Sequence, residues 1–294
     1  MIPRGRKIGV TTDVSVTDMK PRSEILFPTR LGAVFLAAFL FAGCATLPDP
    51  SDKDAVAEFK EVNDPGEPAM RAIFEANLVL DKMFLKPAAE FYKGFLPPAL
   101  QRGVHNVLNN LRTPIILLND VLQGKFERAG TTLARFFVNS TVGILGFSDQ
   151  AAEMGMEYHN EDFGQTLAVW GTDEGPYVML PIFGPSNPRD TVGLAVDFLT
   201  DPINVWARST DRAAVVWARS GTRAVDERVR NFDVIEDLEK SSLDFYATVR
   251  SLYRQRRKDE INDGKSSGNK PAPGLGEDSP FPSTNDGLEV SRSK

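Results

Sequence analysis

Few side chains in this sequence could carry catalytic or metal chemistry. The 294 residues include one cysteine, Cys44, and two histidines, His105 and His159. A single thiol excludes an intramolecular disulfide and a multi-cysteine metal site, and the histidines are too far apart in sequence to suggest a metal-ligand motif. The chain has no G-x-S-x-G nucleophile motif. The tetrapeptide at 263–266 resembles the end of a phosphate-binding loop, but Asp259 stands where that loop requires glycine. The sequence therefore predicts a protein that is not an enzyme and needs no cofactor or metal.

Cys44 lies where a thiol can be modified with lipid. Arg22 and Arg30 precede the uncharged apolar run Leu31–Ala42, which is followed by Gly43 and then by the cysteine. The run has the length of a signal-peptide core and is short for a transmembrane helix. Small residues before a cysteine resemble the bacterial lipobox, in which the thiol receives diacylglycerol and the chain is cut before the cysteine. We therefore expect Cys44 to be a lipid anchor.

Three other positions bear on how the signal peptide is made and how the lipoprotein is sorted. Phe41 stands where a lipobox more usually has Leu, and the alternative is an ordinary signal peptide with an incidental cysteine. Ala45, rather than Asp, follows Cys44, which favours sorting to the outer membrane over retention in the inner membrane. Translation from Met19 would place Lys20 in a normal basic region ahead of the apolar run. We therefore consider Met19 as an alternative start to Met1.

The charge balance limits the possible partners. The chain has 34 basic and 40 acidic residues and a formal net charge of −6. This acidic balance argues against a nucleic-acid-binding surface and against membrane attachment through basic charge. Membrane contact must then come from acyl chains or from apolar surface.

Helical periodicity and capping residues predict a helical body between an acidic tether and a polar tail. We expect one helix to begin at Pro68 and another after a cap at Ser148-Asp149. The further predicted helices are Pro98–Arg112, Thr113–Gly124, Phe126–Ser140, Asn187–Leu199, Asp201–Asn231 with a break near Gly221, and Asp233–Glu260. After Asn262 the sequence is rich in Gly, Ser, Pro, Asp and Asn, which predicts a disordered tail.

Polar residues interrupt two of the predicted apolar helices. Asn77 and Asp81 fall within the apolar face of the helix that begins at Pro68. They either fix a neighbouring loop through hydrogen bonds or line a polar passage. Arg135 and Asn139 belong to a polar stripe on a later helix. That stripe is either a solvated face or a place where guanidinium groups contact lipid phosphate.

The segment Glu161–Asp190 fits neither an ordinary helix nor an ordinary strand. It contains four glycines and four prolines, yet every residue between Pro176 and Gly184 except Pro181 is apolar. Proline excludes an unbroken helix or a central strand at this position. Such a segment is either a loop that crosses the core of a soluble domain or an irregular segment held against lipid.

This segment also carries a family resemblance. The blocks FGQTL, WG, GPYVMLPIFGPS and RD occur in an order that resembles the signature of the VacJ/MlaA family of outer-membrane phospholipid-transport lipoproteins. Further blocks agree in register: NDPGEP at 63–68, FEANLVLD at 74–81, LLNDVLQG at 117–124, ARFFVNSTVGILG at 134–146 and SLDFYATVRSLYRQRR at 242–257. Met70 and Phe245 stand where the family pattern has Asn and Pro.

The resemblance implies an all-α fold: a flat, ring-like single helical domain with an irregular apolar Gly/Pro-rich segment and an amphipathic central channel. It implies a lipoprotein in the periplasmic (inner) leaflet of the outer membrane. The predicted organisation is a signal peptide at 1–43, an acylated N-terminus and tether at 44–62, the helical domain at 63–258 and a disordered tail at 259–294.

The resemblance also implies a function. Family members associate with trimeric outer-membrane porins and pass phospholipid that has strayed into the outer leaflet to a soluble periplasmic carrier, which maintains lipid asymmetry. The alternatives are a structural lipoprotein that tethers porins without moving lipid, and a lipid hydrolase, which the missing motifs disfavour. Asn77, Asp81, Arg135 and Asn139 are candidates for the channel lining or its support. The candidate lipid-facing residues are Ile115, Leu118, Leu122, Met179, Leu180, Ile182 and Phe183.

Overall fold

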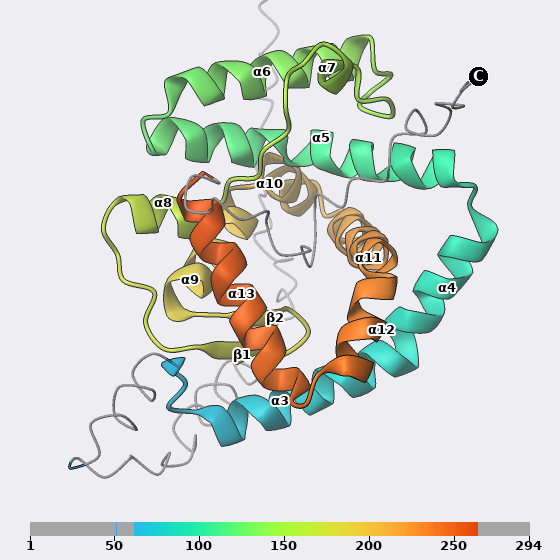
Figure 1. Cartoon of the computed structure of the whole chain (residues 1–294). Coiled ribbons are helices and arrows are strands. Elements are labelled where there is room, and N and C mark those ends of the chain that lie inside the picture. The colour runs from blue at the N-terminus through green and yellow to red at the C-terminus, as the bar shows by residue number, and fades with distance from the viewer. Residues whose placement is uncertain (1–50, 52–61, 264–294) are drawn as a thin grey trace, which may run out of the picture. The chain divides into compact units, whose positions relative to one another are not determined.

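The computed structural model describes residue 51 and residues 62–263 (Figure 1). These residues fall within one compact unit, Gly43–Lys294. The predicted signal peptide, Cys44 with most of the tether, and the chain after Asp263 lie outside the described residues, so the domain boundaries stay predictions.

The described part of the chain is almost entirely helical. Its first half contains α3 (Glu67–Leu80), the π-helix η1 (Asp81–Leu85), α4 (Lys86–Phe95), α5 (Pro98–Leu122), α6 (Phe126–Thr141), α7 (Gln150–Glu153) and α8 (Phe163–Val169). Two short strands follow, β1 (Val178–Leu180) and β2 (Gly184–Ser186), and then α9 (Pro188–Thr200), α10 (Pro202–Ser209), α11 (Ala213–Arg230), α12 (Phe232–Ser241) and α13 (Phe245–Ile261). The all-α prediction is confirmed.

Side-chain caps explain where several helices begin. Asp149 accepts a hydrogen bond from the Ala152 N–H at the start of α7. Asn187 accepts one from the Asp190 N–H at 2.8 Å at the start of α9. Asp201 accepts from two backbone N–H groups of α10. Each cap satisfies a donor that the helix itself cannot pair.

The predicted break at Thr113-Pro114 is wrong, because α5 runs through it as one helix of 25 residues. Pro114 removes one backbone hydrogen bond, but α6 and α8 both pack against α5. Tertiary packing of this kind commonly outweighs the local helix-breaking tendency of a residue.

The helix breaks near the C-terminus also differ from the prediction. The chain breaks at Asp211, where φ is 57°, rather than near Gly221, which lies inside α11. Asp tolerates the left-handed region better than most residues because its short side chain can hydrogen-bond locally. The predicted final helix is divided into α12 and α13, and Asp244 caps α13 by accepting from the Ala247 N–H.

The Gly/Pro-rich segment contains the helix α8 and a β-hairpin, so it is more regular than predicted. β1 pairs with β2 in antiparallel register, with Met179 opposite Pro185. Pro181 lies in the turn, where it removes no ladder hydrogen bond. Ile182 next to it has a φ of 71°, and Gly184 has a φ of 82°.

The hairpin, α3 and α13 enclose the hydrophobic core. The core residues are Met70, Phe74, Tyr177, Val178, Met179, Tyr246 and Val249. The Phe74 ring packs edge-to-face against Phe245 at 5.4 Å and against Tyr246 at 5.5 Å. Phe245 therefore contributes to the packing of this core.

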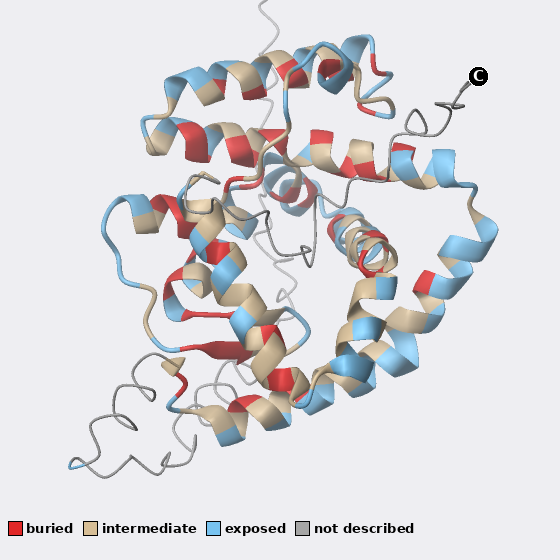
Figure 2. Ribbon diagram, in the orientation of Figure 1, coloured by how far each residue is buried: buried red, intermediate tan, exposed pale blue. Residues whose placement is uncertain are grey.

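Within the unit, α3, η1, α4 and α5 follow one another along an arc, and α8 to α13 lie on its inner side (Figure 1). α6 lies along α5 on the outer side of the arc. Figure 2 shows buried residues on β1 and along α5, whereas α4 is mostly exposed.

Candidate functional site

A pocket of about 590 Å³ lies among α5, the hairpin, α9, α10, α11 and α13. Its apolar lining includes Ile115, Leu180, Phe183, Leu194, Phe198, Val249 and Leu252. Its charged lining is Arg112, Arg219, Arg223, Arg256 and Arg257, with Asp162, Asp190, Asp197, Asp201 and Glu260. The pocket is therefore amphipathic, and its volume suits a small-molecule headgroup.

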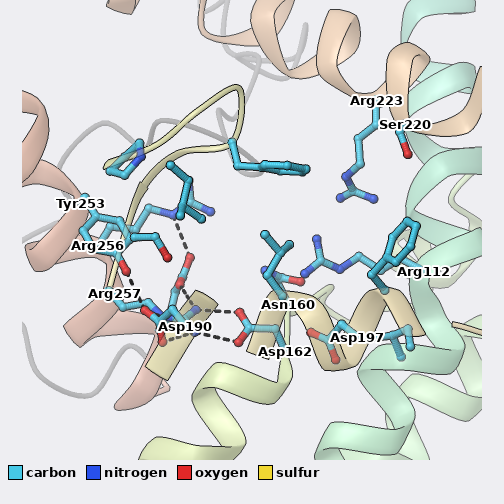
Figure 3. Close-up of a pocket in the computed structure, with 18 of the residues that line it drawn as sticks. Arg112, Asn160, Asp162, Asp190, Asp197, Ser220, Arg223, Tyr253, Arg256 and Arg257 are labelled. Atoms are coloured by element: carbon cyan, nitrogen blue, oxygen red, sulfur yellow. Dashed lines mark hydrogen bonds and ion pairs between the residues drawn. The ribbon is translucent and has the colours of Figure 1, made fainter. Parts of the chain in front are cut away.

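Arg257 organises one wall of the pocket (Figure 3). Its Nη1 and Nη2 donate to the two carboxylate oxygens of Asp162 at 2.6 and 2.7 Å. Its Nε and Nη2 donate to the two oxygens of Asp190 at 2.8 and 3.0 Å. Tyr253 donates its hydroxyl to Asp190 at 2.6 Å. One guanidinium thus joins α13 to the start of α8 and to α9 through two bidentate pairs.

These contacts explain the acidity of the two carboxyl groups. Burial acts to raise the pKa of Asp162, but the charge and hydrogen bonds of Arg257 outweigh burial and hold that pKa well below its usual range. The same balance lowers the pKa of Asp190. Both groups are therefore ionised at neutral pH.

Two glycines permit this arrangement. A Cβ at Gly164 would lie 2.5 Å from Nη2 of Arg257 and 2.7 Å from Oδ1 of Asp190. A Cβ at Gly193 would lie 2.3 Å from the backbone nitrogen of Gly164. α8 and α9 can therefore approach closely enough to share Arg257 only because these positions carry no side chain.

Asp197 has a different environment from the other pocket carboxylates. It accepts hydrogen bonds from Nδ2 of Asn119 at 3.2 Å and from the Phe163 N–H at 3.0 Å. Among the residues that the structure describes, it has no ion-pair partner. Burial, followed by the negative charge of Asp162, raises the pKa of Asp197 to about 6.

The predicted polar residues of α3 and η1 lie outside the pocket lining. Asn77 donates to the carbonyl of Leu180 at 2.9 Å and accepts from the Ile182 N–H at 2.8 Å. Asn77 therefore fixes the hairpin turn, as the loop-fixing alternative predicts. Asp81 accepts from Nε and Nη2 of Arg228 at 2.8 and 3.1 Å, which joins η1 to α11.

The polar stripe of α6 is buried, so the predicted solvated face is wrong. Arg135 donates through Nη2 to Asp149 at 2.7 Å and also to the carbonyl of Met156. Asn139 donates to Asp149 at 2.9 Å and accepts from the Ala151 N–H at 3.0 Å. The stripe holds α7 and its flanking loops against α6. Arg135 therefore contacts protein rather than an outer surface where it could meet lipid phosphate.

The predicted lipid-facing residues lie in three kinds of surroundings, and Phe183 belongs to two of them. Leu118, Ile182 and Phe183 are exposed, at 39%, 79% and 70%, and Leu122 is half-buried. Ile115, Leu180 and Phe183 line the pocket. Met179 is only 1% exposed and belongs to the core between α3 and α13. Its prediction is wrong because β1 lies inside the fold, where Met179 and the neighbouring Val178 are both buried in the core.

The two histidines are engaged in hydrogen bonds within the fold. His105 Nδ1 lies 2.7 Å from Asp226, and its Nε2 lies 2.9 Å from Nδ2 of Asn109. His159 Nε2 lies 3.0 Å from Oδ1 of the fully buried Asp120. These contacts fit the structural role that the sequence predicts for His105.

A second feature of the molecule is an unusual amount of exposed apolar side chain. Phe91 and Phe95 of α4 stack at 5.5 Å, yet they are 71% and 72% exposed. Phe126 and Phe137 of α6 are 71% and 59% exposed. The loop after α6 adds Ile144 and Leu145, and η1 adds Met83 and Phe84. Exposed apolar side chains in such number are typical of a protein that contacts a membrane or a protein partner.

None of the helices in residues 62–263 combines the length and the hydropathy needed to cross a bilayer.

The family model of the MlaA lipoprotein matches residues 62–260. The chain belongs to this family. The match includes every residue that lines the pocket. The amphipathic pocket, with Arg257 in its wall, therefore lies within the part of the chain that matches the family.

Relatives of known name agree with this assignment. The intermembrane phospholipid transport system lipoprotein MlaA of Haemophilus influenzae is 32% identical over 236 residues, which cover 78% of this chain and 89% of the relative. The protein of the same name from Escherichia coli K12 is 30% identical over 242 residues, which cover 80% of this chain and 90% of the relative.

A solved structure shows the same fold. It comes from work on the structural basis for maintenance of bacterial outer membrane lipid asymmetry. It is 31% identical to this chain, with a TM-score of 0.59, and the alignment covers 68% of this chain and 99% of the other.

The residues of the pocket were mostly missed by the sequence analysis. Asp162, Gly164, Asp190 and Arg257 lie in or beside the blocks FGQTL, RD and SLDFYATVRSLYRQRR, which carry the family resemblance. A signal was therefore present, but Asp162 and Arg257 are 95 positions apart. Neither periodicity nor spacing relates residues at that separation.

Proposed function

We propose that this protein is an outer-membrane lipoprotein that removes mislocalised phospholipids from the outer leaflet. Phospholipid would pass through an amphipathic channel, of which the pocket is part, to a soluble periplasmic carrier, so that lipid asymmetry is maintained. The observation that carries this proposal is the amphipathic pocket inside a helical body whose outer helices expose aromatic side chains.

The physical requirement is clear. A charged headgroup strongly resists transfer into hydrocarbon, because its hydrogen bonds to water are lost. Arginines, carboxylates and Asn160 can replace those bonds in the pocket, while Leu194 and Phe198 offer apolar contact to the rest of the lipid. A passage with both kinds of lining lowers the barrier for an amphipathic molecule.

The exposed apolar side chains support the proposed location. Phe91, Phe95, Phe126 and Phe137 project from α4 and α6 rather than into the core. In the inner leaflet these rings would lie against acyl chains, and the lipid attached to Cys44 would add stable anchoring. The family membership and the names of the relatives support the same site of action.

The proposed partners follow from the same family resemblance. A trimeric porin would hold the protein at the outer membrane, and a soluble periplasmic lipid-binding carrier would receive the phospholipid. The relatives' name, which places them in an intermembrane phospholipid transport system, supports the need for such a carrier.

The test is the phospholipid content of the outer leaflet in cells that lack this protein. Complementation with wild type should restore a low content, whereas Cys44→Ala should restore it poorly despite equal expression. If loss of the protein leaves the outer leaflet unchanged, transport by this protein is contradicted. A structural lipoprotein that tethers porins predicts that result.

A further inference from the structure

Two arginines and two carboxylates of the pocket come from four different helices. Arg112 on α5 and Arg223 on α11 extend into the space between these helices, with Ser220 beside Arg223 (Figure 3). Asp162 and Asp197 come from the start of α8 and from α9 (Figure 3). A ligand in this pocket can therefore meet guanidinium groups of α5 and α11 together with carboxylates of α8 and α9.

Most carboxylates of the pocket are already neutralised by arginine. Asp162 and Asp190 pair with Arg257. Asp201 pairs with Arg219 at 2.6 Å, and Glu260 pairs with Arg256 at 2.7 Å and with Arg257 at 3.0 Å. Within residues 62–263, Asp197 is the pocket carboxylate for which the structure shows hydrogen bonds but no cation.

Asp197 is well suited to receive a cation. Each of its oxygens accepts one hydrogen bond, from Asn119 or from the Phe163 N–H, and a carboxylate oxygen can accept a second. Burial and the charge of Asp162 both disfavour its ionised form and raise its pKa to about 6. At neutral pH it therefore carries a poorly compensated negative charge, which a bound ammonium would stabilise.

Arg112 is a neighbour of this carboxylate. Its positive charge acts to lower the pKa of Asp197, so the two groups are close enough to interact. A guanidinium fork matches the oxygens of a phosphate. In an ethanolamine headgroup the phosphate and the ammonium are joined by two carbons, so their binding groups must also be neighbours.

We propose, on the basis of the proposed function, that the pocket recognises a zwitterionic phospholipid headgroup that ends in a primary amine. Arg112 and Arg223 bind the phosphate, and Asp197 binds the ammonium. A choline headgroup has no N–H donor for Asp197, and a glycerol headgroup has no positive charge. The pocket thus selects phosphatidylethanolamine over phosphatidylcholine and phosphatidylglycerol.

The test uses the full-length acylated protein in detergent micelles that contain equal amounts of these three phospholipids. Native mass spectrometry then identifies the lipids that remain bound and gives their relative amounts. We expect phosphatidylethanolamine to be enriched about fivefold, as roughly one hydrogen-bonded charge pair would give. Equal binding of the three lipids would overturn the inference.

Variants separate the two halves of the site. Asp197→Asn should abolish the preference for phosphatidylethanolamine without reducing phosphatidylglycerol binding. Arg223→Gln should weaken the binding of all three lipids to the same extent. Glu161→Gln is the matched control, because Glu161 is fully buried and its pKa is also raised by burial, but it does not line the pocket. The control should keep the preference, and a preference that survives Asp197→Asn would contradict the assigned role.

The outcomes also distinguish this inference from the function on which it rests. If wild type binds all three phospholipids equally and the cells still need it for outer-leaflet composition, headgroup selection fails while transport stands. If the protein binds no phospholipid and its loss leaves the composition of the outer leaflet unchanged, headgroup selection and transport are both contradicted.

Discussion

Two regions of the molecule bury opposite kinds of side chain. One is the hydrophobic core between α3, the hairpin and α13, and the other is the helix α6. The core encloses Met70, Phe74 and Tyr246. α6 buries Arg135 and Asn139 and exposes Phe126 and Phe137. Both regions are amphipathic, so amphipathicity identifies each as a helix or strand that packs on one face. It does not determine which face is outside, because that depends on the surroundings of the region.

The reversed orientation of α6 follows from the contacts of its polar residues. Its polar stripe meets Asp149 and the backbone of α7, and these groups need hydrogen-bond partners when buried. The apolar side of the helix is then left facing outward. In water this arrangement would be unfavourable, whereas against acyl chains it is favourable. The contrast between the two regions therefore supports a membrane environment on the α6 side.

The largest expected effect comes from truncating the core. Phe74→Ala should lower the free energy of unfolding by about 3–5 kcal/mol, because it removes a buried ring and two edge-to-face contacts. Phe137→Ala on the exposed face of α6 is the matched change, and it should alter stability by less than about 0.5 kcal/mol. Chemical unfolding in detergent measures both. Equal losses for the two variants would remove the distinction between the regions.

A smaller loss is expected from the polar stripe of α6. Arg135→Met should lower the free energy of unfolding by about 2–3 kcal/mol, since it leaves Asp149 without its cation. Asp149 is partly exposed, so the loss should be below that of a fully buried pair. Arg256→Met, which removes a partly exposed pair with Glu260 within one helix, should lower the free energy of unfolding by less than about 1 kcal/mol. A stable Arg135→Met protein would show that the buried stripe does not hold α7.

The smallest expected change in stability lies in the pocket between the two regions. The pKa of Asp197 is about 6 in the folded protein and is lower in the unfolded chain, so folding binds a proton there. This proton stabilises the protein below pH about 4, and the stabilisation is lost as the pH rises through about 6. Asp197→Asn should therefore raise the free energy of unfolding at pH 7 by about 1–2 kcal/mol.

The pH dependence provides the check on this prediction. The variant and wild type should have similar stability near pH 4, and the variant should gain between pH 4 and pH 7. The gain is kept modest because Asn presents one carbonyl oxygen, whereas Asn119 and Phe163 donate to two oxygens of Asp197. A variant that is less stable than wild type at pH 7 would contradict the assigned environment.

The sequence predicts the start or end of a helix well where local residues, such as a capping side chain, determine it. The starts of α9 and α10 follow from Asn187 and Asp201, whose side chains cap the helices that proline begins. The ends of α6 follow from its periodicity. The breaks at Asp211 and before Asp244 could not be predicted, because they depend on how neighbouring helices pack rather than on a strong local breaker.

The site was harder to predict than the fold. Asn77 was identified correctly as a residue that fixes a loop, since a buried amide within an apolar face needs partners. Arg257 binds two carboxylates of distant helices, and nothing in its local sequence predicts these partners. The burial of Met179 and Arg135 could not be predicted, because residue type and periodicity do not reveal which face meets the core.

The central claim is that phospholipid headgroups enter the pocket while the body of the protein lies against acyl chains. The most direct test places a photo-crosslinking amino acid at Ser220, which lines the pocket, or at Ser241, at the end of α12 outside its lining. Cells with phosphorus-labelled lipids are then irradiated, and the protein is purified. We predict labelling of the protein at Ser220 but not at Ser241. Labelling at both positions alike, or at neither, would contradict passage of phospholipid through the pocket.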